Sequence, residues 1–282
     1  EINLSQLYYE RSGHGIPLIF VHGAFADMHI FDPQWDYFLD KFPILRYDLR
    51  GHAKTGPSEL RTYKMETFID DLAGLMDALE IPSGIICGLS WGGSIAQGFA
   101  SQHPERTIAI ITASSMVSMS LTLNEKIQQY ILIPHWLMRL IIQSMQVSKF
   151  VEFSLWLAEM FFGKGWLSGD EKVTEYLKQS MRQVESEEYL KLWDAMYGFR
   201  VFDLEKITCP TLVLNGENEP RKMYHHTDEI IKLVPTAQAK VIPNARHAMN
   251  LENPEGFNRR RKNSCVVAAF ANSLPGSVNG LF

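Results

Sequence analysis

Short apolar runs alternate with amphipathic segments along most of the chain. Residues 16–21 are apolar without polar alternation, and residues 43–48 and 107–112 predict two further short strands. A continuous apolar run between turn residues is typical of a strand covered on both faces of a mainly parallel sheet. Residues 65–79 instead carry their apolar side chains at three- and four-residue spacings, which predicts an amphipathic helix.

The same alternation resumes in the last third of the chain. Residues 211–215 predict a strand, residues 226–233 a helix and residues 239–242 another strand. Strands that alternate with helices indicate an α/β fold with a mainly parallel, doubly wound sheet.

The pattern changes in the middle of the chain, where strand signals vanish. Residues 131–142 and 150–162 are long apolar stretches that predict helices with wide apolar faces. Two interpretations stay open: a helical subdomain with its own core, and a lid whose inner face lines an apolar substrate cavity. We therefore predict an α/β core made of residues 1–117 and 203–282, with residues 118–202 inserted as a helical cap.

One sharp turn in the chain has the pattern of a nucleophile. The apolar run 85–87 leads into Gly-x-Ser-x-Gly, formed by Gly88, Ser90 and Gly92, and a helical pattern starts at once. A strand that turns into a helix so abruptly leaves no room for flanking side chains and holds the central residue in a strained turn. Free N–H groups at the start of a helix can stabilise a developing negative charge. A plain glycine-rich turn is the alternative, but the strand before and the helix after favour Ser90 as a nucleophile.

Composition and charge narrow the class of protein. The chain has 282 residues, of which 46% are hydrophobic and 21% charged, with a formal net charge of −5. This is ordinary globular composition, and the mild charge points neither to nucleic acid nor to an anionic membrane surface. No stretch is long and apolar enough for stable membrane insertion, and three scattered cysteines suit neither a disulfide framework nor a zinc site. We expect a cytoplasmic enzyme that needs no cofactor and no metal; a removed leader and a homodimer stay open.

A serine nucleophile needs a base, and the base needs an anionic partner. Among nine histidines, His247 stands out because it follows a late strand, at the sheet edge where Ser90 also emerges. Where a strand–turn–helix elbow carries the nucleophile, the chain order is serine, acid, histidine, which His247 satisfies. A solvated loop histidine is the alternative. His225 and His226 are expected at the surface near a helix start, and His22 is expected to be structural.

The chain resembles α/β-hydrolase-fold serine hydrolases with a helical cap, in the branch of esterases, lactonases and carbon–carbon hydrolases. As a set, the matching motifs are specific for the fold and only weakly specific for a substrate. From residue 16 to about residue 257 they are Val21-His22-Gly23-Ala24, Asp48-Leu49-Arg50-Gly51-His52, Gly88-Leu89-Ser90-Trp91-Gly92-Gly93, Gly216-Glu217-Asn218-Glu219 and Arg246-His247.

The resemblance implies a role for each matching residue. Ser90 would be the nucleophile and His247 the general base, and the backbone amides of Ala24 and Trp91 would form the oxyanion hole. The place of the acid holds Glu219, where the family more commonly has aspartate. Glu217 is a competitor that is usually structural, and we favour Glu219.

The predicted function is that of a serine carboxylesterase, which hydrolyses short- to medium-chain esters of apolar character through an acyl-enzyme on Ser90. Lactonase, perhydrolase and carbon–carbon hydrolase activity stay open, because these enzymes share the triad. A non-catalytic, receptor-like homologue is the alternative outside the enzymes, and the intact triad argues against it. A serine at the elbow also argues against the dehalogenases and epoxide hydrolases of this resemblance, which use an aspartate there.

The C-terminal residues depart from the family pattern. After residues 253–255, where a closing amphipathic helix is expected, the chain has the basic run 259–262. Four charges in an acidic protein are more typical of a solvated face than of a nucleic-acid site. Pro275 and the glycines after it disfavour a regular helix, so we expect partial disorder.

Overall fold

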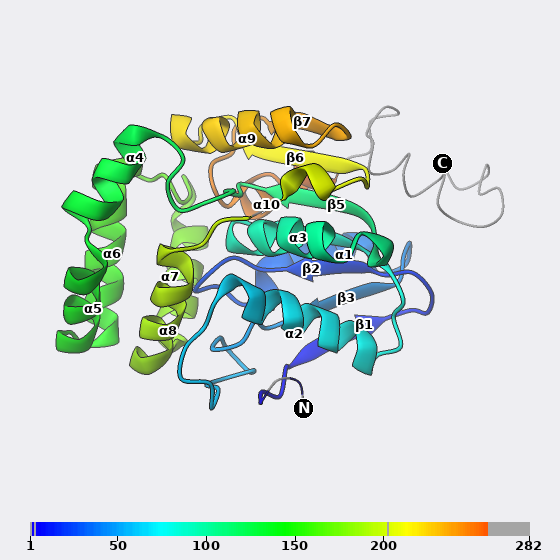
Figure 1. Ribbon diagram of the computed structural model, residues 1–282, viewed down its shortest axis with the longest axis horizontal. Helices are drawn as coiled ribbons and strands as arrows, with labels where there is room; N and C mark the ends of the chain where they lie inside the picture. Colours follow the sequence, from blue (N-terminus) through cyan, green and yellow to red (C-terminus); the bar gives the residue numbers. More distant parts are fainter. Residues whose placement is uncertain (1, 3, 202, 259–282) are drawn as a thin grey trace.

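A computed structural model describes residues 2, 4–201 and 203–258, so the predictions for residues 259–282 lie outside it (Figure 1). Its centre is a seven-stranded sheet in the order β1-β3-β2-β4-β5-β6-β7. β1 pairs antiparallel with β3, and the other pairs are parallel. The strands are β1 (Tyr9–Ser12), β2 (Leu18–Val21), β3 (Ile44–Tyr47), β4 (Gly84–Leu89), β5 (Thr107–Ala113), β6 (Thr211–Gly216) and β7 (Ala237–Ile242).

Helices cover both faces of this sheet, which explains the unbroken apolar runs of the central strands. In β2, Ile19 and Val21 belong to the core layer on one face, and Leu18 and Phe20 to the layer on the other. All four side chains are buried, because successive residues of a strand point to opposite faces and both faces are covered. The predicted mainly parallel α/β architecture is confirmed.

The helices of the core fall where the periodicity predicts them, with two differences. The sequence reading did not anticipate α1, and α9 begins earlier than predicted, directly after Pro220, whose fixed φ suits the start of a helix. The bounds are η1 (Met28–Phe31), α1 (Asp32–Phe38), α2 (Met65–Ala78), α3 (Trp91–Gln102), η2 (Pro104–Arg106), η4 (Leu204–Lys206), α9 (Arg221–Leu233), α10 (Met249–Glu252) and α11 (Pro254–Asn258).

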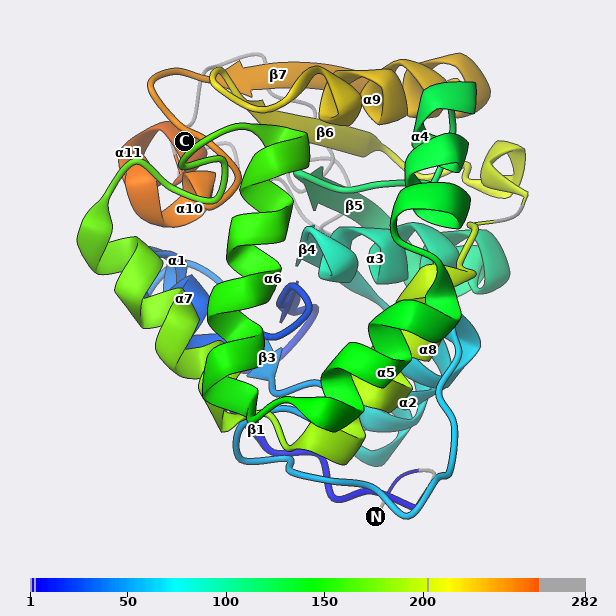
Figure 2. The ribbon, with the colours of Figure 1, turned by 90° about the vertical axis from the view of Figure 1, so that its left-hand side faces the viewer.

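The chain between β5 and β6 leaves the sheet and forms a layer of helices beside it (Figure 2). The two ends of this excursion are joined, because Val201 N donates to Val117 O at 2.7 Å. The helices lie within the predicted cap, whose limits of 118–202 stay a prediction. They are α4 (Leu123–Ile127), the π-helical η3 (Gln128–Leu132), α5 (His135–Ser144), α6 (Val147–Phe162), α7 (Glu171–Gln183) and α8 (Ser186–Tyr197).

A buried carboxylate fixes α8 to the core. Glu188 has 1% of its surface exposed and accepts hydrogen bonds from Tyr63 Oη at 2.5 Å and from Lys191 Nζ at 2.7 Å. Lys191 Nζ also donates to the carbonyl of Ser58 at 2.8 Å. A buried charge is tolerated only when it is paired and hydrogen-bonded, so this cluster ties the cap to one position on the core.

Candidate active site

Ser90 occupies the turn between β4 and α3 with φ of 54° and ψ of −118°. This left-handed conformation costs on the order of 1–3 kcal/mol for a residue with a side chain. A Cβ atom on Gly88 would lie 2.1 Å from Gly92 O, and one on Gly92 would lie 2.0 Å from Val21 O. Neither position has room for a side chain, as expected for a strand that turns sharply into a helix.

The turn after β2 lies against Ser90. A Cβ atom on Gly23 would come within 3.2 Å of Ser90 Cβ. Trp91 is the first residue of α3, where an amide has no acceptor within the helix. Within the described residues, neither the Trp91 amide nor the Ala24 amide donates to a protein group. Two free N–H groups are therefore available beside Ser90; their role as an oxyanion hole stays a prediction.

Two buried histidines hold this turn in place. His22 Nε2 accepts from Leu49 N at 2.8 Å, and His52 Nε2 accepts from Phe25 N at 2.9 Å. His22 Nδ1 lies 2.7 Å from the carbonyl oxygen of Gly23, and His52 Nδ1 lies 2.8 Å from that of Arg50. Each ring is therefore neutral, with its proton on Nδ1. Burial lowers the pKa of His22 to about 4 and that of His52 to about 3. The structural role expected of His22 fits these contacts.

His247 and Glu219 lie together at the carboxyl edge of the sheet. His247 Nδ1 is 3.1 Å from Glu219 Oε1, and Glu219 Oε2 accepts from Gly216 N at 3.2 Å. The Glu219 side chain has no exposed surface. Glu217 is exposed and accepts from Asn244 N at 2.8 Å instead. The geometry thus pairs His247 with Glu219 and leaves Glu217 in the neighbouring loop.

The loop of His247 is held from two sides. Ser114 Oγ donates to the carbonyl of His247 at 3.0 Å, and the Trp166 ring, which comes from the cap, lies 4.9 Å from the imidazole. His247 and Ser90, both within the described residues, do not hydrogen-bond to each other. Catalytic contacts of this kind are often long in a protein without substrate, and the pairing of base and nucleophile stays a prediction.

A second carboxylate links the cap to the turn beside Ser90. Asp27 accepts hydrogen bonds from Tyr176 Oη at 2.6 Å and from Ser180 Oγ at 2.8 Å, both on α7. Burial opposes ionisation of this group, but the two hydroxyls together with His22 and the amide of His29 outweigh it and hold the pKa of Asp27 below its usual value. The charged carboxylate therefore stabilises the docked position of α7.

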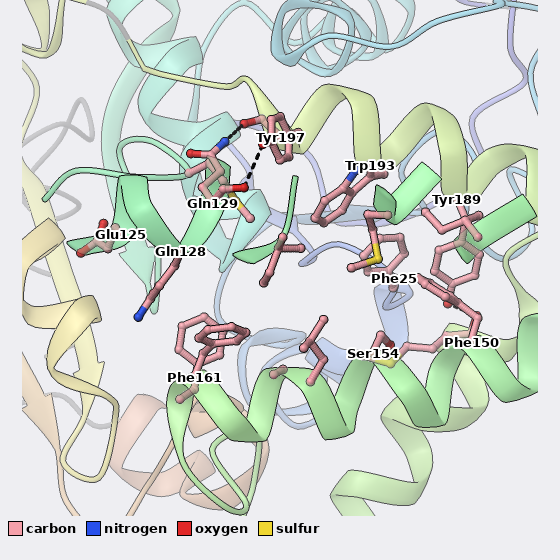
Figure 3. A pocket seen from close by; sticks show the side chains of 18 of the residues that line it. Phe25, Glu125, Gln128, Gln129, Phe150, Ser154, Phe161, Tyr189, Trp193 and Tyr197 are labelled. Carbon is pink, nitrogen blue, oxygen red and sulfur yellow. Dashed lines mark hydrogen bonds between the residues drawn. The ribbon is translucent and has the colours of Figure 1, made fainter. Parts of the chain in front are cut away.

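A cavity of about 190 Å³ lies between the cap helices and the turn (Figure 3). Phe25, two residues after Gly23, forms one wall and stacks on Tyr189 with the ring centroids 4.7 Å apart. Neither Ser90 nor His247 is among the described lining residues; Phe25 is the residue of the turn after β2 that lines the cavity. Most of the lining is apolar and comes from the cap: Met138, Ile142, Phe150, Leu157, Ala158, Phe161, Phe162, Met181, Trp193.

The far end of the cavity carries charge that the sequence reading did not anticipate. Lys222 Nζ donates to Met119 O at 3.0 Å, and burial lowers the pKa of Lys222. Burial disfavours the charge of Glu125 as well, but contacts with His226 and with Leu121 N outweigh it and lower the pKa of Glu125 to about 2. Figure 3 shows Glu125 and Gln128 at one end of the cavity and Phe25 at the other.

The expectation that His226 lies at the surface is wrong. His226 is fully buried in the middle of α9, with Nε2 at 3.5 Å from Glu125 Oε2. Because α9 starts at Arg221, His226 lies inside the helix and not at its start, and its Nδ1 accepts from Val117 N at 3.3 Å. Lys222 and Glu125 meet only through the tertiary fold, since they lie on separate helices, and no local pattern marks either of them. Across residues 2, 4–201 and 203–258, no three His, Cys, Asp or Glu side chains are arranged to hold a metal ion.

The fold and the elbow agree with a family model described as "alpha/beta hydrolase fold", which matches residues 16–254. The chain belongs to this family, and it is a hydrolase with the α/β-hydrolase fold that the sequence predicted.

Individual relatives are distant. The chain is 25% identical over 242 residues to 3-oxoadipate enol-lactonase 2 of Acinetobacter baylyi, covering 86% of this chain and 85% of that protein. The crystal structure of the enol-lactonase from Burkholderia xenovorans superposes with a TM-score of 0.76 at 19% identity, covering 95% and 98% of the two chains. A carboxylesterase from Bacillus subtilis gives 0.72 at 21% identity, covering 97% and 90%. Identities this low support the fold and leave the substrate open.

Proposed function

We propose that the protein is a serine carboxylesterase that hydrolyses short- to medium-chain esters through an acyl-enzyme on Ser90. The observation that carries the proposal is the pairing of His247 with the buried Glu219 on the sheet edge where Ser90 forms the elbow. The apolar cavity beyond Phe25 supports an apolar acyl or alkyl group as the recognised part of the substrate.

In this mechanism, Ser90 Oγ attacks the ester carbonyl as His247 Nε2 takes the hydroxyl proton. Glu219 keeps the proton of His247 on Nδ1 and stabilises the imidazolium. The amides of Ala24 and Trp91 hold the oxyanion, each such donor being worth roughly 10²–10³ in kcat. His247 then protonates the leaving alcohol, and water cleaves the acyl-enzyme by the same route.

A lactonase is the second candidate, favoured by the half-buried Lys222, whose side chain lines the cavity. A lactone is an internal ester, so the same chemistry opens it. Lys222 Nζ uses one of its three hydrogens on Met119 O, which leaves donors for an acidic group on a substrate. The similarity to enol-lactonases agrees with this candidate.

The test is hydrolysis of p-nitrophenyl esters from acetate to laurate by the intact protein and by Ser90→Ala. We expect turnover that is highest for short and medium chains and is abolished in Ser90→Ala. The lactonase would be favoured if the intact protein cleaves none of these esters but opens a carboxylated lactone, and if the Lys222→Met variant opens that lactone more slowly. Ester turnover that survives in Ser90→Ala would contradict both.

A further inference from the structure

In the first cap helix, α4 with η3, the polar and apolar faces are placed the other way round from those of an ordinary surface helix. Its buried side chains are polar: Glu125 and Gln129 expose 5% and 6% of their surface. Most of its exposed side chains are apolar, with Leu123 at 75% and Ile131 at 69%, although Asn124 and Lys126 are exposed as well. A helix on the surface of a water-exposed protein normally shows the opposite arrangement.

Hydrogen bonds hold the polar side of this helix against the cavity. Gln129 Nε2 donates to the carbonyl of Tyr197, and Tyr197 Oη donates to Gln129 O at 2.9 Å (Figure 3). Glu125 Oε2 accepts from Leu121 N at 2.7 Å. Gln129 Oε1 has no hydrogen-bond partner among the described residues. The bonds of Gln129 Nε2 and Glu125 nevertheless hold these two side chains on the inner side of the helix, which leaves its apolar side chains facing outward.

The neighbouring helices α5 and α6 also carry exposed apolar side chains, Trp136 and Leu140 on α5 and Trp156 and Met160 on α6. Figure 2 shows α4, α5 and α6 on the same side of the molecule. Monomeric proteins rarely expose contiguous apolar patches beyond a few hundred Å² unless the patch binds something. We call the following residues the cap apolar face: Leu123, Ile127, Tyr130, Ile131, Leu132, Trp136, Leu140, Trp156 and Met160.

Between positions 122 and 149 the exposed charged side chains are basic, although the whole chain carries −5. Lys126 and Lys149 are exposed, and Arg139 is paired with Asp194 of α8. Glu125 is the only acidic residue between positions 122 and 149, and it is buried. Tryptophan and tyrosine among aliphatic side chains, flanked by lysine, are typical of helices that lie in a membrane interface.

We propose that the cap apolar face docks onto an anionic lipid surface. No helix within the described residues is long and apolar enough to cross a membrane. The helices would lie in the plane of the interface, with Trp136 and Ile131 among the acyl chains and Lys126 near the headgroups. Gln128 and Ile133, in and just after η3, line the cavity on the other side of the same helical segment. An apolar substrate dissolved in the lipid would therefore have a short path into the cavity.

The test is flotation of the full chain with vesicles of phosphatidylcholine alone or mixed with phosphatidylserine. We expect the protein to float with the mixed vesicles and to release as salt is raised. In Ile131→Glu/Trp136→Glu the affinity for mixed vesicles should fall by about tenfold or more, because charge replaces inserted apolar groups. Lys126→Gln should lower it by about fivefold. The matched control Ile231→Glu, on α9 away from the cap face, should bind as the unchanged protein does.

Flotation is measured without substrate, so a lack of vesicle binding can be distinguished from a lack of the proposed esterase activity. Absence of binding to mixed vesicles would overturn the proposal, as would an equal loss of binding in Ile231→Glu. Analytical ultracentrifugation tests the rival occupant. A dimer that Ile131→Glu/Trp136→Glu converts to a monomer, without vesicle binding, would show that a second copy covers the face. Circular dichroism checks that each variant is folded.

Discussion

Glu219 Oε1 lies 3.1 Å from His247 Nδ1, and the other carboxylate oxygen is held by the amide of Gly216. The carboxylate is thus fixed from its own strand end while it faces the imidazole. A buried acceptor at this place keeps the imidazole proton on Nδ1 and leaves Nε2 free to accept a proton. The longer side chain of glutamate still reaches the histidine because Glu219 N bonds back to Gly216 O at 3.1 Å, which keeps the loop tight.

Glu219→Gln should therefore lower kcat for p-nitrophenyl butyrate by roughly 10³–10⁴, because the amide stabilises neither the imidazolium nor the productive tautomer. Glu217→Gln is the matched control in the same loop and should change kcat by less than about threefold, since its side chain faces Asn244 N. Equal losses in the two variants would argue against Glu219 as the acid.

The buried histidines beside the turn predict an acid-sensitive fold. The pKa values of His22 and His52 are about 4 and 3 in the folded protein, against an ordinary 6.5. The unfolded chain therefore takes up these protons first, and the free energy of unfolding should fall as the pH drops from about 6.5 toward 4, by up to about 1.4 kcal/mol per pH unit for each group.

Urea denaturation at pH 7.5, 6 and 5 measures this slope. His52→Gln removes one of the two groups and should flatten it, whereas His14→Gln, an exposed histidine, should leave it unchanged. A slope unaffected by His52→Gln would mean that other groups govern the acid sensitivity.

Part of the fold and of the candidate active site could be predicted from the sequence, and part could not. The elbow is a local constraint: the contacts of Gly88 and Gly92 arise within one turn, so the motif alone predicts them. The pairing of His247 with a glutamate was anticipated from the family pattern, and the choice of Glu219 over Glu217 depends on the loop that the fold forms. The meeting of Lys222 with Glu125 depends on how the cap packs on α9. No periodicity within either helix contains that information.

The sequence also did not predict that apolar side chains of the cap helices are exposed. Wide apolar faces suggested either a subdomain core or a cavity lining, and both interpretations assume that apolar residues face inward. In α4 they face outward, because Glu125 and Gln129 take the inner positions.

Filling the cavity should shorten the preferred acyl chain. Ala158 on α6 lines the cavity, so Ala158→Phe should lower kcat/KM for p-nitrophenyl decanoate by about tenfold or more and change that for the acetate little. Ser148→Phe places the same ring on an exposed position of α6 and serves as the control. An unchanged chain-length profile in Ala158→Phe would show that the acyl group binds elsewhere.

The contact between α7 and Asp27 should contribute measurably to stability. Tyr176→Phe removes a hydrogen bond to a charged carboxylate and should lower the free energy of unfolding by about 2 kcal/mol, read from chemical denaturation. Tyr130→Phe removes a hydroxyl from a tyrosine that is 60% exposed and should change stability by less than about 0.5 kcal/mol. Equal stability of the two variants would mean that Tyr176 does not hold the cap in place.

The most direct test of the account is the site of covalent labelling. Intact-mass measurement after treatment with a p-nitrophenyl alkylphosphonate, followed by peptide mapping, reports which side chain displaces the nitrophenolate. We predict one phosphonyl group per chain on the peptide that contains Ser90, no label in Ser90→Ala, and slower labelling in His247→Gln. Labelling of a different residue, or equal labelling of Ser90→Ala, would contradict the assignment of Ser90 as the nucleophile.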